Sequence, residues 1–224
     1  MAASRELRID LPDGDEMSAL FDRPATPRSL LVLAHGAGAG MAHPFLEALS
    51  GELNSAGIAT LRYQFPYMEK RRKVPDKPAV LTAAVRAVVD KAKELAPTLP
   101  LFAGGKSMGG RMTSTATSEH PLEGVKGLVF FGFPLHPPNR PGTKRAGHLS
   151  RVTVPMLFLQ GTRDAFADLQ LLRPICAQLG SRATLEVVEG ADHSFHVLKA
   201  SGKNDSEVLH DVASYVASWT SQLL

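Results

Sequence analysis

Apolar and polar positions change their spacing repeatedly along the chain, and this change predicts strands that alternate with helices. Two opening strands are predicted at residues 5–10 and 17–21, joined by the turn sequence PDGDE. Near-continuous apolar runs, typical of buried strands, lie at residues 29–35, 58–65, 99–105, 124–133, 154–161 and 184–190. Helical spacing of apolar residues occurs at 43–56, 78–96, 108–119, 168–179 and 205–222.

This alternation predicts an α/β fold with a mostly parallel central sheet and helices on both faces. Neither an internal repeat nor a shift in composition divides the chain, so we expect a single domain over residues 1–224. Residues 134–150 are rich in proline, glycine and basic residues. We interpret this segment as a loop over the carboxyl edge of the sheet, too short and irregular to be a lid domain.

Composition narrows the class of protein only slightly. Hydrophobic residues make up 44% and charged residues 21%, as in ordinary soluble proteins, and no apolar run is long enough to cross a membrane. The formal net charge of +3 does not by itself indicate nucleic acid binding. The basic cluster at residues 70–73 is interpreted as a solvated loop, with a surface for an anionic substrate or partner as the alternative.

The only cysteine, Cys176, rules out an intrachain disulfide and favours the cytoplasm as the compartment. It lies in a predicted helix, where we expect a buried and unreactive thiol. The N-terminal sequence has no apolar core of a secretory signal.

Two glycine-rich stretches raise the question of a nucleotide site. GGKSMGGR at residues 104–111 contains a Gly-Lys-Ser, but a P-loop would require glycine where the chain has Pro100. HGAGAG at residues 35–40 lies between a strand and a helix, yet the third glycine of a dinucleotide motif would fall on Met41 or His43. No acidic residue closes the next strand to bind a ribose. We therefore expect no nucleotide cofactor.

The same stretch matches the nucleophile elbow G-x-S-x-G, with Ser107 on a sharp turn between a buried strand and a helix. A serine needs a base to remove its proton and a carboxylate to orient that base. Asp164 and His193 follow the strands at 154–161 and 184–190, in the order that α/β-hydrolases use. Because parallel strands bring their carboxyl ends to one edge, we predict a triad of Ser107, Asp164 and His193.

Three nearby residues compete for the roles of acid and base. Asp168 lies four residues beyond Asp164, in the next predicted helix, and remains a weaker candidate for the acid. Asp192 adjoins the histidine and is interpreted as part of the loop structure. His196 is expected to pack or to line the pocket.

The predicted oxyanion hole combines two backbone N–H groups, those of Met108 at the start of a helix and Ala37 in the HGAGAG loop. Lys106, at the variable position of the elbow, is expected to shape the turn and do little else. Candidate pocket walls, for which ordinary packing is an equal alternative, are Tyr63, Phe65, Phe133, His136 and Phe195.

With these residues in place, the chain from about residue 28 resembles the α/β-hydrolase superfamily. The resemblance extends to a small, cap-less branch that includes testis-expressed KANL/Tex-type proteins and lies near dienelactone-hydrolase-like enzymes. It is carried by AHGAGAGM, GGKSMGGR, FPLHPP at 133–138 and GADHSF at 190–195. The resemblance implies a serine hydrolase with the triad named above and with no cofactor and no metal. Serine at position 107 departs from dienelactone hydrolases, which use a cysteine nucleophile.

We therefore expect hydrolysis of a small or medium carboxylic ester, or a thioester, through an acyl-enzyme. The expected partner is a small-molecule ester, without nucleic acid or membrane, and no oligomeric state is predicted. Two alternatives stay open. One is a catalytically idle scaffold that binds a protein partner through residues 69–73, and the other is a peptidase or amidase.

Overall fold

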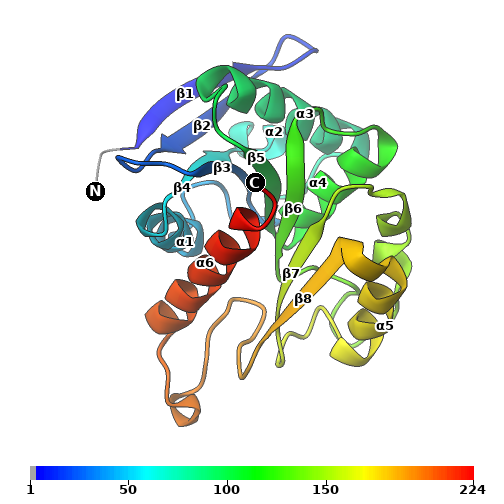
Figure 1. Cartoon of the computed structure of the whole chain (residues 1–224). Coiled ribbons are helices and arrows are strands. Elements are labelled where there is room, and N and C mark those ends of the chain that lie inside the picture. Colours follow the sequence, from blue (N-terminus) through cyan, green and yellow to red (C-terminus); the bar gives the residue numbers. More distant parts are fainter. Residues whose placement is uncertain (1–3) are drawn as a thin grey trace.

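The computed structural model describes residues 4–224, in which eight strands form one sheet with helices on both faces (Figure 1). The strands lie in the order β1-β2-β4-β3-β5-β6-β7-β8. Their bounds are β1 (Arg5–Asp10), β2 (Glu16–Asp22), β3 (Ser29–Ala34), β4 (Ile58–Tyr63), β5 (Leu101–Lys106), β6 (Val125–Phe131), β7 (Met156–Gly161) and β8 (Ala183–Val188). β2 pairs antiparallel with β1 and with β4, and all other neighbours are parallel. The predicted mostly parallel α/β fold is confirmed.

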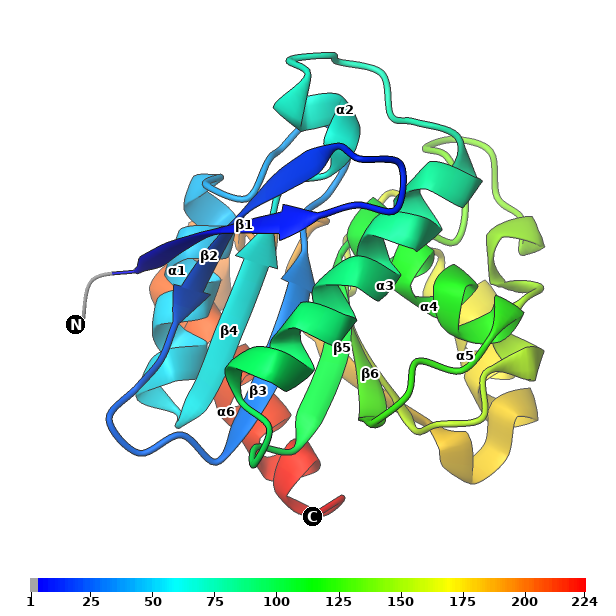
Figure 2. The same ribbon diagram turned by 90° about the horizontal axis from the view of Figure 1, so that it is seen from above.

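Helices connect the parallel strands and cover both faces of the sheet. Their bounds are α1 (Pro44–Ser55), α2 (Pro66–Glu69), α3 (Pro78–Leu95), α4 (Met108–Glu119), α5 (Leu169–Leu179) and α6 (Asp205–Ser221). Figure 2 shows α3, α4 and α5 on one side of the sheet and α1 with α6 on the other. Sequence analysis missed α2, because four residues are too few to show a helical period.

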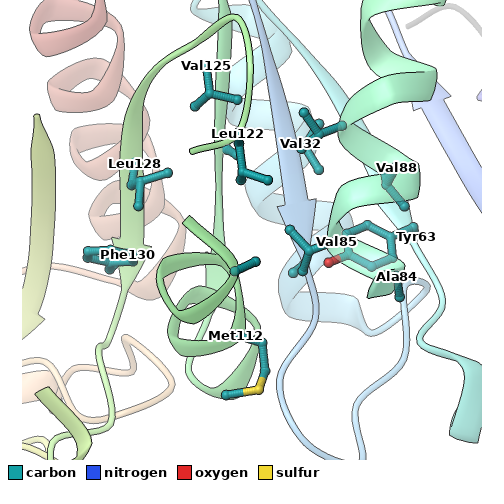
Figure 3. Packing of buried hydrophobic residues seen from close by; sticks show 14 of the residues in the cluster. Val32, Tyr63, Ala84, Val85, Val88, Met112, Leu122, Val125, Leu128 and Phe130 are labelled. Carbon is teal, nitrogen blue, oxygen red and sulfur yellow. The ribbon is translucent and has the colours of Figure 1, made fainter. Parts of the chain in front are cut away.

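The sheet separates two hydrophobic cores, and alternate residues of each central strand supply them. In β3, Leu30 and Val32 point into the core beneath α3 and α4, whereas Leu31 and Leu33 join the core beneath α1 and α6. Figure 3 shows part of the first core, to which Val32 of β3, Tyr63 of β4 and Val85 of α3 contribute side chains. Burial on both faces explains the near-continuous apolar runs in the sequence and holds the carboxyl ends of the strands in fixed positions.

The segment after β6 is irregular, as predicted, and no lid domain interrupts residues 4–224. It contains two short 3₁₀ turns, Lys144–Ala146 and Leu149–Arg151. Leu149 is buried, and the ring of His148 lies 2.7 Å from the hydroxyl of Ser114 on α4. These contacts fix the segment against the body of the protein.

Cys176 is buried in α5, as predicted, and burial raises the pKa of its thiol to about 11.

Within residues 4–224, no helix has both the length and the apolar character needed to cross a membrane.

Candidate active site

Ser107 lies on the sharp turn that joins β5 to α4. Its backbone angles, φ 51° and ψ −117°, are unusual for a residue with a side chain and represent local strain. Two hydrogen bonds hold this conformation. The N–H of Ser107 donates to the carbonyl of Phe131 (3.2 Å), and the N–H of Arg111 donates to the carbonyl of Ser107 (3.1 Å).

The glycines of the elbow allow β3 and α4 to approach each other closely. A Cβ on Gly109 would lie 2.6 Å from the carbonyl oxygens of both Ala34 and His35, closer than side chains approach backbone. A Cβ on Gly105 would also collide with Ala34. The sequence G-x-S-x-G therefore satisfies a packing requirement at the point where the end of β3 meets the start of α4.

A continuous chain of hydrogen bonds joins the three residues that sequence analysis selected. His193 Nε2 lies 2.9 Å from Ser107 Oγ, and His193 Nδ1 lies 2.7 Å from Asp164 Oδ2. The residues come from the loops after β5, β7 and β8. The side chain of Asp164 is 1% exposed and that of His193 is 20% exposed, so the carboxylate lies inside the protein and the imidazole near the surface.

Two residues that sequence analysis did not find hold the Asp164 carboxylate in place. Gln160 donates from Nε2 to Asp164 Oδ2 at 2.5 Å, and the N–H of Phe166 donates to Asp164 Oδ1 at 2.8 Å. The ring of Phe166 also packs on His193, with 4.3 Å between ring centroids. A signal for Gln160 existed in the sequence, since it is a polar residue in an otherwise apolar strand.

The two predicted oxyanion donors belong to the start of α4 and to the loop after β3. Met108 is the first residue of α4, so its N–H has no acceptor within the helix. Ala37 belongs to the loop after β3, and this loop contacts the elbow, because a Cβ on Gly36 would lie 3.7 Å from Ser107 Cβ. The bonds that shape this loop use the N–H groups of Gly38 and Ala39, and not that of Ala37.

His35 and Tyr67 hold the loop that carries Ala37. The N–H of Phe65 donates to His35 Nε2 (3.0 Å), which places the ring proton on Nδ1, where it donates to the carbonyl of Gly36 (2.7 Å). Burial lowers the pKa of His35 to about 4, so the ring is neutral at neutral pH. The hydroxyl of Tyr67, on α2, accepts the N–H of Gly38 at 3.0 Å. Sequence analysis found neither role.

The family model that describes sequences of the alpha/beta hydrolase domain matches residues 27–221. The chain belongs to this family. Its structure resembles a serine hydrolase without lid from Xanthomonas campestris, at 22% identity and a TM-score of 0.73, with 96% of each chain covered. It also resembles a serine hydrolase homologue from Coxiella burnetii (17%, TM-score 0.77, 96% of this chain and 98% of that chain). A dienelactone hydrolase from Anabaena variabilis is similar too (19%, TM-score 0.76, 98% and 97%). The expected likeness to a cap-less branch of α/β-hydrolases is confirmed.

In this α/β-hydrolase, the three residues that competed for the roles of acid and base hydrogen-bond to nearby loops and helix ends instead. Asp168 is the N-cap of α5 and accepts the N–H of Gln170 at 2.8 Å. Asp192 accepts the N–H groups of Ser194 and His196. The exposed ring of His196 lies 2.9 Å from the Asp205 carboxylate, and so it neither packs in the core nor lines a pocket as expected.

Four of the five candidate pocket walls are fully buried. Tyr63, Phe65, Phe133 and Phe195 are each at most 1% exposed, so they present no surface to a substrate. Packing, the alternative considered from the sequence, describes these four side chains. The fifth, His136, accepts the N–H of Asp168 at its Nε2 (3.0 Å) and thereby ties the segment after β6 to the start of α5.

The expectation that Lys106 only shapes the turn stays a prediction. The structure shows that the side chain is buried: the residue is 8% exposed, and its amine has no hydrogen-bond partner within residues 4–224. Burial lowers the pKa of Lys106 to about 8, although Asp164 and Asp192 act in the opposite direction.

The basic cluster at residues 70–73 is exposed, as the solvated-loop interpretation expects. Lys70 pairs with Asp15 and Arg72 pairs with Asp76, each at 2.5 Å.

The described part of the chain contains no group of three or more His, Cys, Asp or Glu side chains arranged to bind a metal.

Proposed function

We propose that the protein is a serine hydrolase that cleaves a carboxylic ester, or a thioester, of small or medium acyl size. The observation that carries this proposal is the hydrogen-bonded chain from Ser107 through His193 to Asp164, with the serine on a strained turn at the start of a helix. A serine, a base and a carboxylate in this geometry suit nucleophilic attack on a carbonyl carbon.

In the acylation step, Ser107 Oγ attacks the substrate carbonyl while His193 Nε2 takes the serine proton. Asp164 accepts a hydrogen bond from the Nδ1–H group of His193, so the ring presents Nε2 as the base, and the carboxylate stabilises the imidazolium that forms. The N–H groups of Met108 and Ala37 donate to the oxygen that gains negative charge. His193 then gives its proton to the departing alcohol or thiol, and the acyl group remains on Ser107.

Deacylation repeats the same steps with water. His193 takes a proton from a water molecule whose oxygen attacks the acyl carbon, and Ser107 leaves with the proton that His193 returns. Gln160 and the N–H of Phe166 keep the Asp164 carboxylate in place through both steps, because each donates to one of its two oxygens.

The preference for small or medium acyl groups rests on the absence of a lid domain among residues 4–224. Without such a cover, few apolar surfaces can enclose a long acyl chain. A cytoplasmic location, suggested by the lone Cys176, belongs to the same proposal.

The test is hydrolysis of chromogenic esters with acyl chains of two to twelve carbons, with the matching anilides in parallel. We expect turnover of the shorter esters, loss of that turnover in Ser107→Ala, and wild-type rates in the control Ser118→Ala, which alters a half-buried serine at the far end of α4. Faster cleavage of anilides than of esters would instead favour a peptidase or amidase. No turnover of any ester by folded protein would favour the scaffold.

A further inference from the structure

Lys106 carries a charged group into the interior beside the candidate triad. Its Nζ is buried and has no hydrogen-bond partner among residues 4–224. It lies 5.8 Å from the ring centroids of both Phe45 and Phe195, which are stacked on each other. Burying an amine without a hydrogen-bond partner costs free energy, so this arrangement calls for a reason beyond packing.

Gly132, just after β6, shows where the amine lies relative to the triad. A Cβ built on Gly132 would be 3.0 Å from Lys106 Nζ, 3.3 Å from Asp164 Oδ2 and 3.4 Å from His193 Nδ1. The amine, the carboxylate and the imidazole therefore surround one small space, which stays open because residue 132 has no side chain. Lys106 thus approaches the histidine on the side opposite to the serine, since Nε2 faces Ser107.

The charged groups that act on Lys106 come from two loops. Asp164, after β7, and Asp192, after β8, are the carboxylates that favour its charged form. His193 is the titratable group of the same loop as Asp192, and α1 contributes the uncharged ring of Phe45. The net effect of burial and these carboxylates is a pKa of Lys106 of about 8, so the amine changes charge close to neutral pH.

We propose that Lys106 is a positioning residue whose buried ammonium group sets the charge balance of the His193–Asp164 pair. This inference rests on the proposed function. The ammonium group stabilises the Asp164 carboxylate and opposes protonation of His193, because like charges repel in the weakly screening interior. The base then stays neutral, and able to accept the serine proton, at lower pH than it would without Lys106.

The size of this effect follows from Coulomb's law. The Gly132 distances of 3.0 and 3.4 Å place the amine no more than about 6.4 Å from His193 Nδ1. At such a separation and with the screening typical of protein sites, one charge displaces the titration of another by roughly one pH unit or more. When Lys106 loses its proton, its positive charge no longer repels the imidazolium that forms on His193 during attack. We therefore expect the rate of attack by Ser107 to rise again as the pH passes about 8.

The experiment measures the rate of Ser107 labelling by a fluorophosphonate probe as a function of pH. In the wild type we expect an acid limb followed by a second, several-fold rise near pH 8. Lys106→Met should lack the second rise, and its acid limb should move up by roughly one pH unit. Lys106→Arg keeps its charge throughout, so it should retain the wild-type acid limb without the rise near pH 8. Lys126→Met alters an exposed lysine of β6 and is the control.

A second measurement keeps this inference separate from the proposed function. In protein with ¹³C-labelled histidine, the ring resonance of His193 should show a step near pH 8 in the wild type that Lys106→Met abolishes. This step does not require turnover, so it tests Lys106 even if the probe labels nothing. The inference is overturned if the wild type shows no such step, or if wild type and Lys106→Met label with the same pH profile. Absence of labelling in all variants together with the histidine step would contradict only the proposed function.

Discussion

At the scale of single residues, Gly109 shows that the elbow motif is a packing constraint as well as a catalytic pattern. Its Cα lies so close to the end of β3 that any side chain would meet two carbonyl oxygens at 2.6 Å. We expect Gly109→Ala to lower the free energy of unfolding by about 2 kcal/mol or more, because backbone must move to relieve the contact.

Urea denaturation measures this loss, and Gly142→Ala is the matched control. A Cβ on Gly142 would meet nothing within 4 Å, so the same substitution there should leave the urea midpoint nearly unchanged. Equal stability of Gly109→Ala and the wild type would show that β3 and α4 are packed less closely than the structure indicates.

For Lys106 we predict that a substitution raises the free energy of unfolding, whereas Gly109→Ala lowers it. The pKa of its amine is about 8 in the folded protein and 10.5 in the unfolded chain, so the folded state disfavours the charge. This destabilisation is complete below pH 8 and disappears as the pH rises to 10.5. Lys106→Met should therefore be more stable than the wild type by roughly 3 kcal/mol at pH 7.

Urea denaturation at pH 7 and at pH 10 tests this prediction, since the advantage of Lys106→Met should shrink at the higher pH. An advantage that stays constant across this range would indicate a packing effect unrelated to charge. A loss of stability at pH 7 would show that the ammonium group has partners that the structure does not reveal.

At the scale of elements, the short helix α2 holds the loop after β3, although the two segments are well separated in the sequence. Tyr67 of α2 accepts the N–H of Gly38, next to the proposed oxyanion donor Ala37. Tyr67→Phe removes the acceptor and leaves that N–H unpaired, so the loop loses one of the bonds that fix it. We expect kcat/KM for a short ester to fall roughly tenfold, the equivalent of about one hydrogen bond.

Tyr215→Phe on α6 is the control for this experiment, because it removes a tyrosine hydroxyl from the other face of the sheet. The two variants should have similar urea midpoints and differ in kcat/KM. An unchanged kcat/KM in Tyr67→Phe would remove α2 from the account of the site.

The elements differ in how far the sequence predicted them. Central strands such as β3 and β7 were predicted because burial on both faces leaves continuous apolar runs. The short helix α2 was not, since a single turn has no period to detect. The elbow was found from its glycines and serine. Phe166 supports Asp164 through a backbone contact that no sequence spacing encodes, whereas the only signal for Gln160 was a polar residue in an otherwise apolar strand.

At the scale of the whole molecule, the parallel sheet brings together residues that are far apart in sequence. Ser107 and His193 are 86 residues apart, yet they meet because their strands end at the same edge. This gathering could be predicted from the sequence, since it depends on strand direction alone. The buried roles of Lys106 and Phe195 could not, since they depend on how loops from both halves of the sheet fold over that edge.

Acid should destabilise the whole fold through two histidines that the folded protein holds neutral, the buried His35 and the half-buried His148. Burial lowers the pKa of His35 and of His148 from 6.5 to about 4, with Arg111 and Arg151 adding to the effect at His148. The unfolded chain therefore binds more protons between these values, and stability should fall as the pH drops from 6.5 towards 4.

The urea midpoint measured from pH 7.5 to pH 4.5 checks this prediction at constant ionic strength. His148→Gln should give a shallower decline than the wild type, whereas His210→Gln, at an exposed site beside Glu52, should not. Identical slopes in the three proteins would contradict the assignment of a neutral, half-buried ring to His148.

The central claim is that Ser107 is a nucleophile activated by His193 and Asp164, and covalent labelling tests it most directly. Folded protein is treated with a fluorophosphonate, and the adduct is counted by intact mass and located by peptide mass spectrometry. We predict one adduct per chain, on Ser107, absent in Ser107→Ala and formed far more slowly in His193→Gln. No adduct on well-folded protein, or an adduct that persists in Ser107→Ala, would contradict the account.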